Sequence, residues 1–100
     1  MVDVNEQQLD LRQKNSWMLK LDEVSTGELA EVMAINAIAP SVINARLKTL
    51  MEASPEPMRF IVNVSAMEGQ FYREHKTDKH PHTNMAKAAL NMMTRTSAVD

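Results

Sequence analysis

The sequence contains no cysteine, which excludes disulfides, cysteine-based zinc sites and thiol nucleophiles together. It has only two glycines, Gly27 and Gly69. A phosphate-binding loop needs several glycines close together, so that its backbone can approach the phosphate. Because these two glycines are far apart, the chain has no self-contained nucleotide-phosphate loop of that kind. Aromatic residues make up only 4% of the chain, whereas there are nine methionines.

Charge and hydropathy exclude further classes. The formal net charge is −2 and the pI about 5.9, so no nucleic-acid partner is expected. The longest mostly apolar run, residues 32–43, is too short to span a bilayer, and residues 1–21 contain no apolar signal-peptide core. We therefore expect no membrane partner and a cytoplasmic location. An apolar fraction of 44% favours a folded chain.

A long helix is predicted over residues 25–53. Ser25 and Glu28 have the spacing of a capping box, and Ser54 before Pro55 disfavours further helix. At 100° per residue the apolar side chains form two stripes, which indicates burial on two sides, one against this chain and the other against a partner helix or second subunit. The first stripe contains Leu29, Val32, Met33, Ile43, Leu47, Leu50 and Met51, and the second contains Ile35, Ile38 and Val42.

The remaining chain divides into four segments. Residues 1–24 are predicted to be irregular, with residues 17–21 as a short strand or docking segment. The β-branched run 59–65 indicates a strand buried on both faces, typical of a parallel sheet, which needs neighbours that this chain hardly supplies. A charged loop at 66–81 and a second helix at 82–98 follow. Functional groups are expected in the loop after the strand, as in other α/β folds.

Asn36 and Pro40 are the first candidate site residues. An amide on an apolar stripe is costly unless it is hydrogen-bonded. Pro40 has no N–H, so it cannot donate to the carbonyl of Asn36 four residues earlier, and a kinked helix with one free acceptor is predicted. The simpler interpretation is a tolerated kink that water satisfies.

Each of the other candidates also has a simpler explanation. Lys87 could donate to a ribose or lower a neighbour's pKa, or could be a surface lysine. Ser65 could act at the end of the strand or merely form a hydrogen bond there. Tyr72 lies in a charged loop that is most simply solvated. The three histidines, His75, His80 and His82, lack carboxylates at ligand spacing, so no metal site is predicted.

Three segments, taken in order, resemble the central part of the short-chain dehydrogenase/reductase family. They are V-M-A-I-N-A-I-A-P around Asn36, F-I-V-N-V-S-A-M-E-G ending at Gly69, and H-T-N-M-A-K-A-A-L-N around Lys87. The match covers about residues 29–98. It implies an α/β fold in which residues 25–98 are an incomplete helix–strand–helix piece of a doubly wound, Rossmann-like parallel sheet. It also implies NAD or NADP as cofactor and an alcohol or carbonyl as the small-molecule substrate.

The resemblance assigns roles to individual residues. Asn36 matches the family's active-site Asn, and Lys87 matches its lysine beside the nicotinamide ribose. Asn63, Val64 and Ser65 match the strand end beside the cofactor. Ala66 and Thr83 stand where the family has its catalytic serine and tyrosine. Ser65 and Tyr72 are therefore hypothetical substitutes, because a threonine hydroxyl cannot serve as a phenolic acid.

Two functions follow from these observations. The chain is expected to be a fragment of a divergent NAD(P)-dependent oxidoreductase, which does not bind cofactor in isolation because the phosphate loop is missing. The alternative is a non-catalytic relative or oligomerisation module. In both, the two long helices are expected to form a homo-oligomer, as the family resemblance implies.

Overall fold

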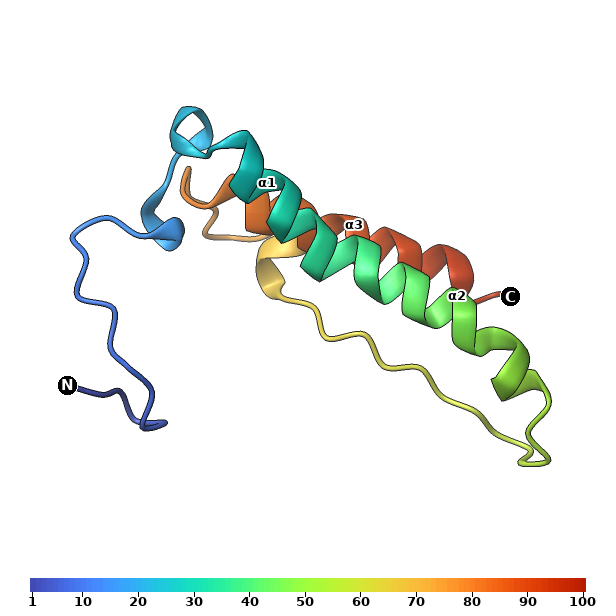
Figure 1. Cartoon of the computed structure of the whole chain (residues 1–100). Coiled ribbons are helices and arrows are strands. Elements are labelled where there is room, and N and C mark those ends of the chain that lie inside the picture. Colours follow the sequence, from blue (N-terminus) through green and yellow to red (C-terminus); the bar gives the residue numbers. More distant parts are fainter.

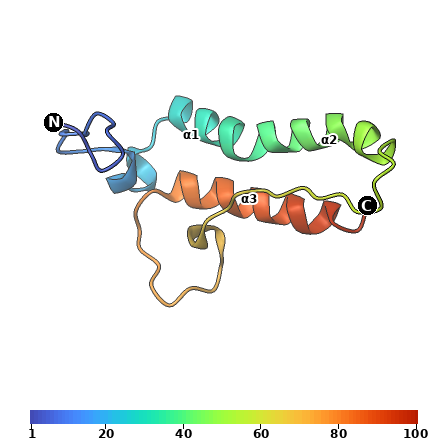
Figure 2. The same ribbon diagram turned by 90° about the horizontal axis from the view of Figure 1, so that it is seen from below.

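The computed structural model describes residues 1–100, which form two helical rods joined by an extended chain (Figure 1). The first rod is continuous and comprises α1 (Thr26–Met33), the π-helix η3 (Ala34–Ile38) and α2 (Ala39–Glu52). The second rod is α3 (Pro81–Ser97). Both rods run in the same direction, because the chain returns between them over residues 53–80 (Figures 1 and 2).

The first rod begins at a side-chain cap and changes its hydrogen-bond spacing before a proline. The Ser25 hydroxyl accepts a bond from the Glu28 N–H at 3.1 Å. Near the middle, the Ala39 N–H binds the carbonyl of Ala34, five residues back, which is π-helical spacing. Pro40 follows at once and has no N–H to donate. The irregularity predicted at this proline is therefore a short π-helical segment within an otherwise continuous rod.

The predicted α/β fold, a piece of a doubly wound Rossmann-like parallel sheet, is wrong. The structure is helical and contains no sheet, and its one β-type pairing is an isolated bridge between Val2 and Gln8. Residues 59–65, predicted to be a buried strand, form an extended chain without a partner strand (Figure 1). The physical reason is that a strand exists only through its ladder, and no other segment lies beside this one to provide it.

The N-terminal segment docks on the beginning of α3. It contains two short 3₁₀ turns, η1 (Ser16–Met18) and η2 (Leu21–Glu23). The carbonyl of Leu19 accepts from the His80 N–H at 2.6 Å, and the Trp17 ring packs edge-on against the His80 ring with centroids 5.0 Å apart. Residues 17–21 are thus a docking segment rather than a strand.

The core of the molecule is small. The buried apolar side chains are Ala37, Ala86 and Leu90, where the middle of the first rod packs against α3. A third 3₁₀ turn, η4 (Met67–Gly69), packs against α3 from the other side. The accessible surface is 8327 Å², whereas a compact monomer of 11.3 kDa exposes about 5,700 Å². The radius of gyration is 16.9 Å, against about 13 Å for a compact domain of this length.

None of the helices is both long enough and apolar enough to cross a membrane.

Candidate functional site

A cavity of about 360 Å³ lies between the first rod, the extended chain and α3. We call it the inter-rod cavity. Its walls are apolar side chains interrupted by three amides and one ammonium group. The lining residues are Ile35, Asn36, Pro40, Ile43, Asn44, Val62, Asn63, Val64, Lys87 and Leu90. Four residues predicted for the site, Asn36, Asn63, Val64 and Lys87, are therefore brought together here.

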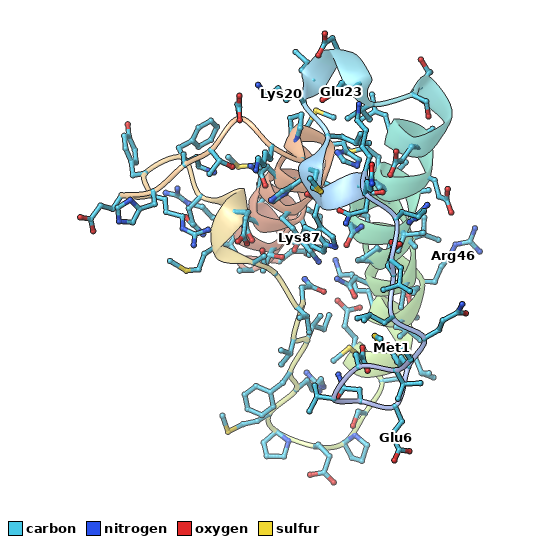
Figure 3. The ribbon with its side chains drawn as sticks, turned by 90° about the vertical axis from the view of Figure 1, so that its left-hand side faces the viewer. Met1, Glu6, Lys20, Glu23, Arg46 and Lys87 are labelled. Carbon is cyan, nitrogen blue, oxygen red and sulfur yellow. The ribbon has the colours of Figure 1, made fainter.

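Lys87 is the only charged residue that lines the cavity. It comes from the second turn of α3 and is half-buried between α3 and the extended chain, as Figure 3 shows. Its Nζ donates to the carbonyl of Val64 at 3.0 Å. Lys87 therefore ties α3 to the end of the extended chain while presenting a positive charge to the cavity.

One polar face of α3 holds the end of the extended chain, residues 63–65. Asn91 and Thr94 follow Lys87 at helical spacings of four and three, so the three side chains share that face. The Ser65 hydroxyl donates to Oδ1 of Asn91 at 2.5 Å, and Nδ2 of Asn63 donates to the Thr94 hydroxyl at 2.9 Å. Asn91 and Thr94 were not among the predicted site residues, although their spacing from Lys87 could have indicated them.

Asn63 is also bound from the opposite side. Its Oδ1 accepts a bond of 3.1 Å from Nδ2 of Asn44, which lies on α2. The Asn63 amide thus bridges the two rods through Asn44 and Thr94. A single polar side chain in the extended segment sets the separation of α2 from α3 on this side of the cavity.

Asn36 occupies the π-helical segment and is half-buried. Its Nδ2 donates to the Val32 carbonyl at 3.0 Å, one turn earlier. The side-chain amide is thereby satisfied within its own helix. The main-chain carbonyl of Asn36 remains without a donor from Pro40, as expected from the sequence.

The remaining predicted residues lie outside the cavity. Ser65 is exposed and binds Asn91, whereas Tyr72 is 99% exposed and lies in the 66–80 loop. Thr83, at the family's tyrosine position, donates to the carbonyl of His80 at 2.9 Å and contacts the His80 ring. The Thr83 hydroxyl therefore forms its hydrogen bond within the first turn of α3. Tyr72 is therefore not near the groups it was predicted to complement.

A second polar cluster, which was not predicted from the sequence, joins the N-terminal segment to α1 and α3. The Ser16 hydroxyl donates to the Glu28 carboxylate, and this bond, with the nearby His82 ring, lowers the pKa of Glu28 below 4.5. Nε2 of His82 lies 3.5 Å from Oε1 of Glu28, and the His82 side chain is fully buried. No group of three or more His, Asp or Glu side chains has a metal-binding arrangement.

The polar groups that line the inter-rod cavity are the amides of Asn36, Asn44 and Asn63 and the ammonium group of Lys87. No carboxylate, imidazole or phenol lines it, so Lys87 is the only titratable group there. Three amides and one ammonium can bind a polar, anionic or hydroxyl-bearing group. A general acid–base pair, which most hydrolytic or redox reactions at carbon require, is not assembled around the cavity.

Comparison with known proteins adds one relative. No family model matches the chain, and no solved structure matches it. An uncharacterized protein of Acanthamoeba polyphaga mimivirus is 40% identical over 87 residues. The matched region is 87% of this chain but 18% of the viral protein. The chain thus spans less than a fifth of that relative's length, and the name of the relative assigns it no activity.

Proposed function

We propose that the chain is a non-catalytic assembly module that self-associates through one apolar stripe of the first rod. Ile35, Ile38 and Val42 form this helix stripe, at helical spacings of three and four. Their exposed fractions are 61%, 56% and 49%, although isoleucine and valine are among the residues most often buried in folded proteins. This exposure is the observation that carries the proposal.

The shape of the molecule supports the same function. Its accessible surface exceeds that of a compact monomer by about 2,600 Å², from the 8327 Å² given above. A stable interface buries about 800 Å² on each partner, so the excess is large enough for more than one contact. The opposite stripe differs from it only along α1, where Leu29, Val32 and Met33 are partly buried and the helix packs against α3. Along α2, the residues Ile43, Leu47 and Leu50 of that stripe are 54%, 45% and 70% exposed and add to the apolar surface of the rod.

Ile38→Glu tests the helix stripe directly. A glutamate at the centre of an isologous helix contact faces its own copy or an apolar partner, which is unfavourable in either case. We expect the mass measured by light scattering to fall at micromolar concentration, while circular dichroism stays unchanged. Val4→Glu is the matched control, because Val4 is 95% exposed and lies near the N-terminus, outside the first rod. An unchanged mass for Ile38→Glu would contradict the proposal.

A second candidate function is the nicotinamide-dependent oxidoreductase role, as part of a larger protein. The supporting observation is that Asn36, Asn63, Val64 and Lys87 line one cavity. The family resemblance expects the cofactor and its proton relay at these positions, but the parallel sheet of that family is absent from the structure. These residues could contact only part of a nicotinamide cofactor, because the chain has no glycine-rich loop for the cofactor's phosphates and no phenol at the cavity.

Titration of NADH or NADPH fluorescence tests this second function. The isolated chain is expected not to bind at micromolar concentration, whereas a longer polypeptide that contains this segment is expected to bind. Replacing Lys87 with Met in the longer form should weaken binding. The exposed Lys76→Met is the control for the loss of a positive charge. Equal affinity of both variants would exclude Lys87 as a cofactor ligand.

A further inference from the structure

The extended chain has an unpaired backbone as well as exposed side chains. No main-chain to main-chain hydrogen bond involves residues 57–65; such bonds are made by Ser54 on one side and by Ala66 on the other. Polar side chains hold this segment in place, chiefly those of Asn63, Ser65 and Lys87. A row of unpaired N–H and C=O groups is the template to which another extended chain can add.

Side chains alternate along this segment. Phe60, Val62 and Val64 are 72%, 84% and 78% exposed. Of the residues on the other face, Asn63 and Ser65 are bonded to the helices, and Ile61 is 50% exposed. An extended chain with one tethered face and one apolar, β-branched face has the pattern of a half-covered strand.

We propose that residues 59–65 pair antiparallel with the same residues of a second copy, about a two-fold axis at Val62. This pairing rests on the self-association proposed above and adds a second contact to it. Only an extended chain can bond the free backbone groups, because a helix uses its own internally. A second copy is the occupant because the segment complements itself in this register.

The register follows from the sequence around Val62. Antiparallel pairing there places Val62 opposite itself and Phe60 opposite Val64, so that the apolar side chains share one face. Arg59 then lies opposite Ser65, and no like charges meet within the paired residues. A slip of one residue would place Phe60 opposite Asn63 and mix the two faces. Parallel pairing in register would instead place Arg59 opposite Arg59.

The bond from Lys87 indicates which backbone groups meet the partner. Alternate residues of a strand direct their N–H and C=O to opposite edges. The Val64 carbonyl is already directed to Lys87. The main-chain N–H and C=O groups of Ile61 and Asn63 therefore face the other edge. There, Ile61 of one copy and Asn63 of the other exchange both of their main-chain hydrogen bonds. Val62 and its copy then form a non-hydrogen-bonded pair, with Cα atoms about 4.5 Å apart.

Single cysteines test this register, because the natural chain has none. A Cα separation near 4.5 Å allows a disulfide. Val62→Cys should therefore form a disulfide-linked dimer at least tenfold faster than Val64→Cys under mild oxidation. Val64 lies on the same face with similar exposure, but its copy would be about 14 Å away. Mixing Phe60→Cys with Val64→Cys should give the heterodimer.

Three outcomes overturn the pairing. Equal rates for Val62→Cys and the fully exposed Tyr72→Cys mean that the segment does not pair. Equal, fast rates for Val62→Cys and Val64→Cys mean that the strands are parallel. Growth of the unmodified protein into fibrils with a cross-β diffraction pattern means that pairing does not close about a two-fold axis.

Charge substitutions separate this proposal from the helix contact. Two independent two-fold contacts build an assembly larger than a dimer. Val62→Lys should reduce its mass to that of a dimer, and an equal mixture of Val62→Lys and Val62→Glu should restore it. The control Val99→Lys, at a position 93% exposed, should not change the mass. If Val62→Lys lowers the mass but Ile38→Glu does not, the helix stripe fails and the strand pairing stands. If Ile38→Glu lowers the mass but Val62→Lys does not, the strand pairing is overturned and the helix contact stands.

Discussion

At the scale of single residues, Gly69 shows how closely η4 approaches α3. A Cβ at this position would lie 2.8 Å from the main-chain carbon of Lys87. The chain has no glycine with a positive φ, so the requirement is for space and not for a special backbone conformation. The same Cβ would lie 2.8 Å from Nδ2 of Asn91 and 2.9 Å from Cβ of Lys87. The Asn91 amide could turn away, but the main-chain carbon and Cβ of Lys87 cannot move without shifting α3.

We therefore expect Gly69→Ala to lower the free energy of unfolding by about 1–3 kcal/mol, the usual cost of overpacking. Gly27→Ala is the matched control, because nothing lies within 4 Å of a Cβ there and Gly27 belongs to α1. That change should raise stability by up to about 1 kcal/mol, since alanine is the better helix former. Urea unfolding followed by circular dichroism measures both. A loss of stability in Gly27→Ala as large as that in Gly69→Ala would contradict this assignment.

Ser16 and Glu28 make the docking of the N-terminal segment dependent on pH. Because the Ser16 bond lowers the pKa of Glu28, the contact is fully present above pH 4.5 and is lost as the pH falls through the lowered value. Ser16→Ala removes the main cause of the shift, so release should begin at a higher pH. Fluorescence of Trp17, the only tryptophan, reports docking against His80.

The control for this measurement is Ser97→Ala, at the far end of α3. Other carboxylates with lowered pKa values, such as Asp78 beside Lys20, titrate in every variant. The difference between Ser16→Ala and the unmodified chain therefore isolates Glu28. Identical acid transitions in the two proteins would show that Ser16 does not hold this carboxylate.

At the scale of elements, the extended chain depends on Asn63. Asn63→Ala leaves the Asn44 amide without its acceptor and removes the bond that the Thr94 hydroxyl accepts, although that hydroxyl still donates to the Leu90 carbonyl. We expect a loss of about 1–3 kcal/mol and faster cleavage by chymotrypsin at Phe60 as the segment detaches. Val64→Ala, which removes an exposed side chain from the same segment, should change the cleavage rate much less. If both variants were cleaved equally fast, Asn63 would not be the anchor.

The two rods could be predicted from local signals, whereas the arrangement of the extended chain could not. The Ser25 cap and Pro55 mark a helix without reference to the rest of the molecule. The run 59–65 is extended, but a sheet also needs neighbouring strands, and their presence cannot be deduced from the run itself. The local pattern therefore indicated the extended conformation of the run, whereas the α/β fold class that the family resemblance implied is wrong.

Asn36 and Lys87 were expected to lie at one site because of the family resemblance, and not because of their spacing in the sequence. Asn36 and Lys87 lie on helices that flank the same extended chain, and the structure places both at one cavity. Tyr72 was a hypothesis about the conformation of a long charged loop, which no local pattern determines. The Asn44–Asn63–Thr94 chain of bonds joins residues from three segments. Such long-range pairs become visible only when the segments are placed in space.

At the scale of the whole molecule, elongation itself can be measured. The chain extends over 52 × 33 × 29 Å. For a monomer isolated by combining Ile38→Glu with Val62→Lys, small-angle X-ray scattering should give a radius of gyration near the 16.9 Å of the structure. A value of about 13 Å would show that the monomer collapses into a compact domain, and would contradict the two-rod arrangement. Val4→Glu with Val99→Lys serves as the double control that should remain assembled.

The parallel course of the two rods also has a consequence for folding. The connection from the end of α2 to the start of α3, residues 53–80, must close before α3 can pack. Closing a loop of that length costs about 3 kcal/mol of chain entropy. A second copy that orders residues 59–65 shortens the part of the connection still free to move. Assembly and the packing of α3 are then thermodynamically linked, so each should become more favourable as the protein concentration rises.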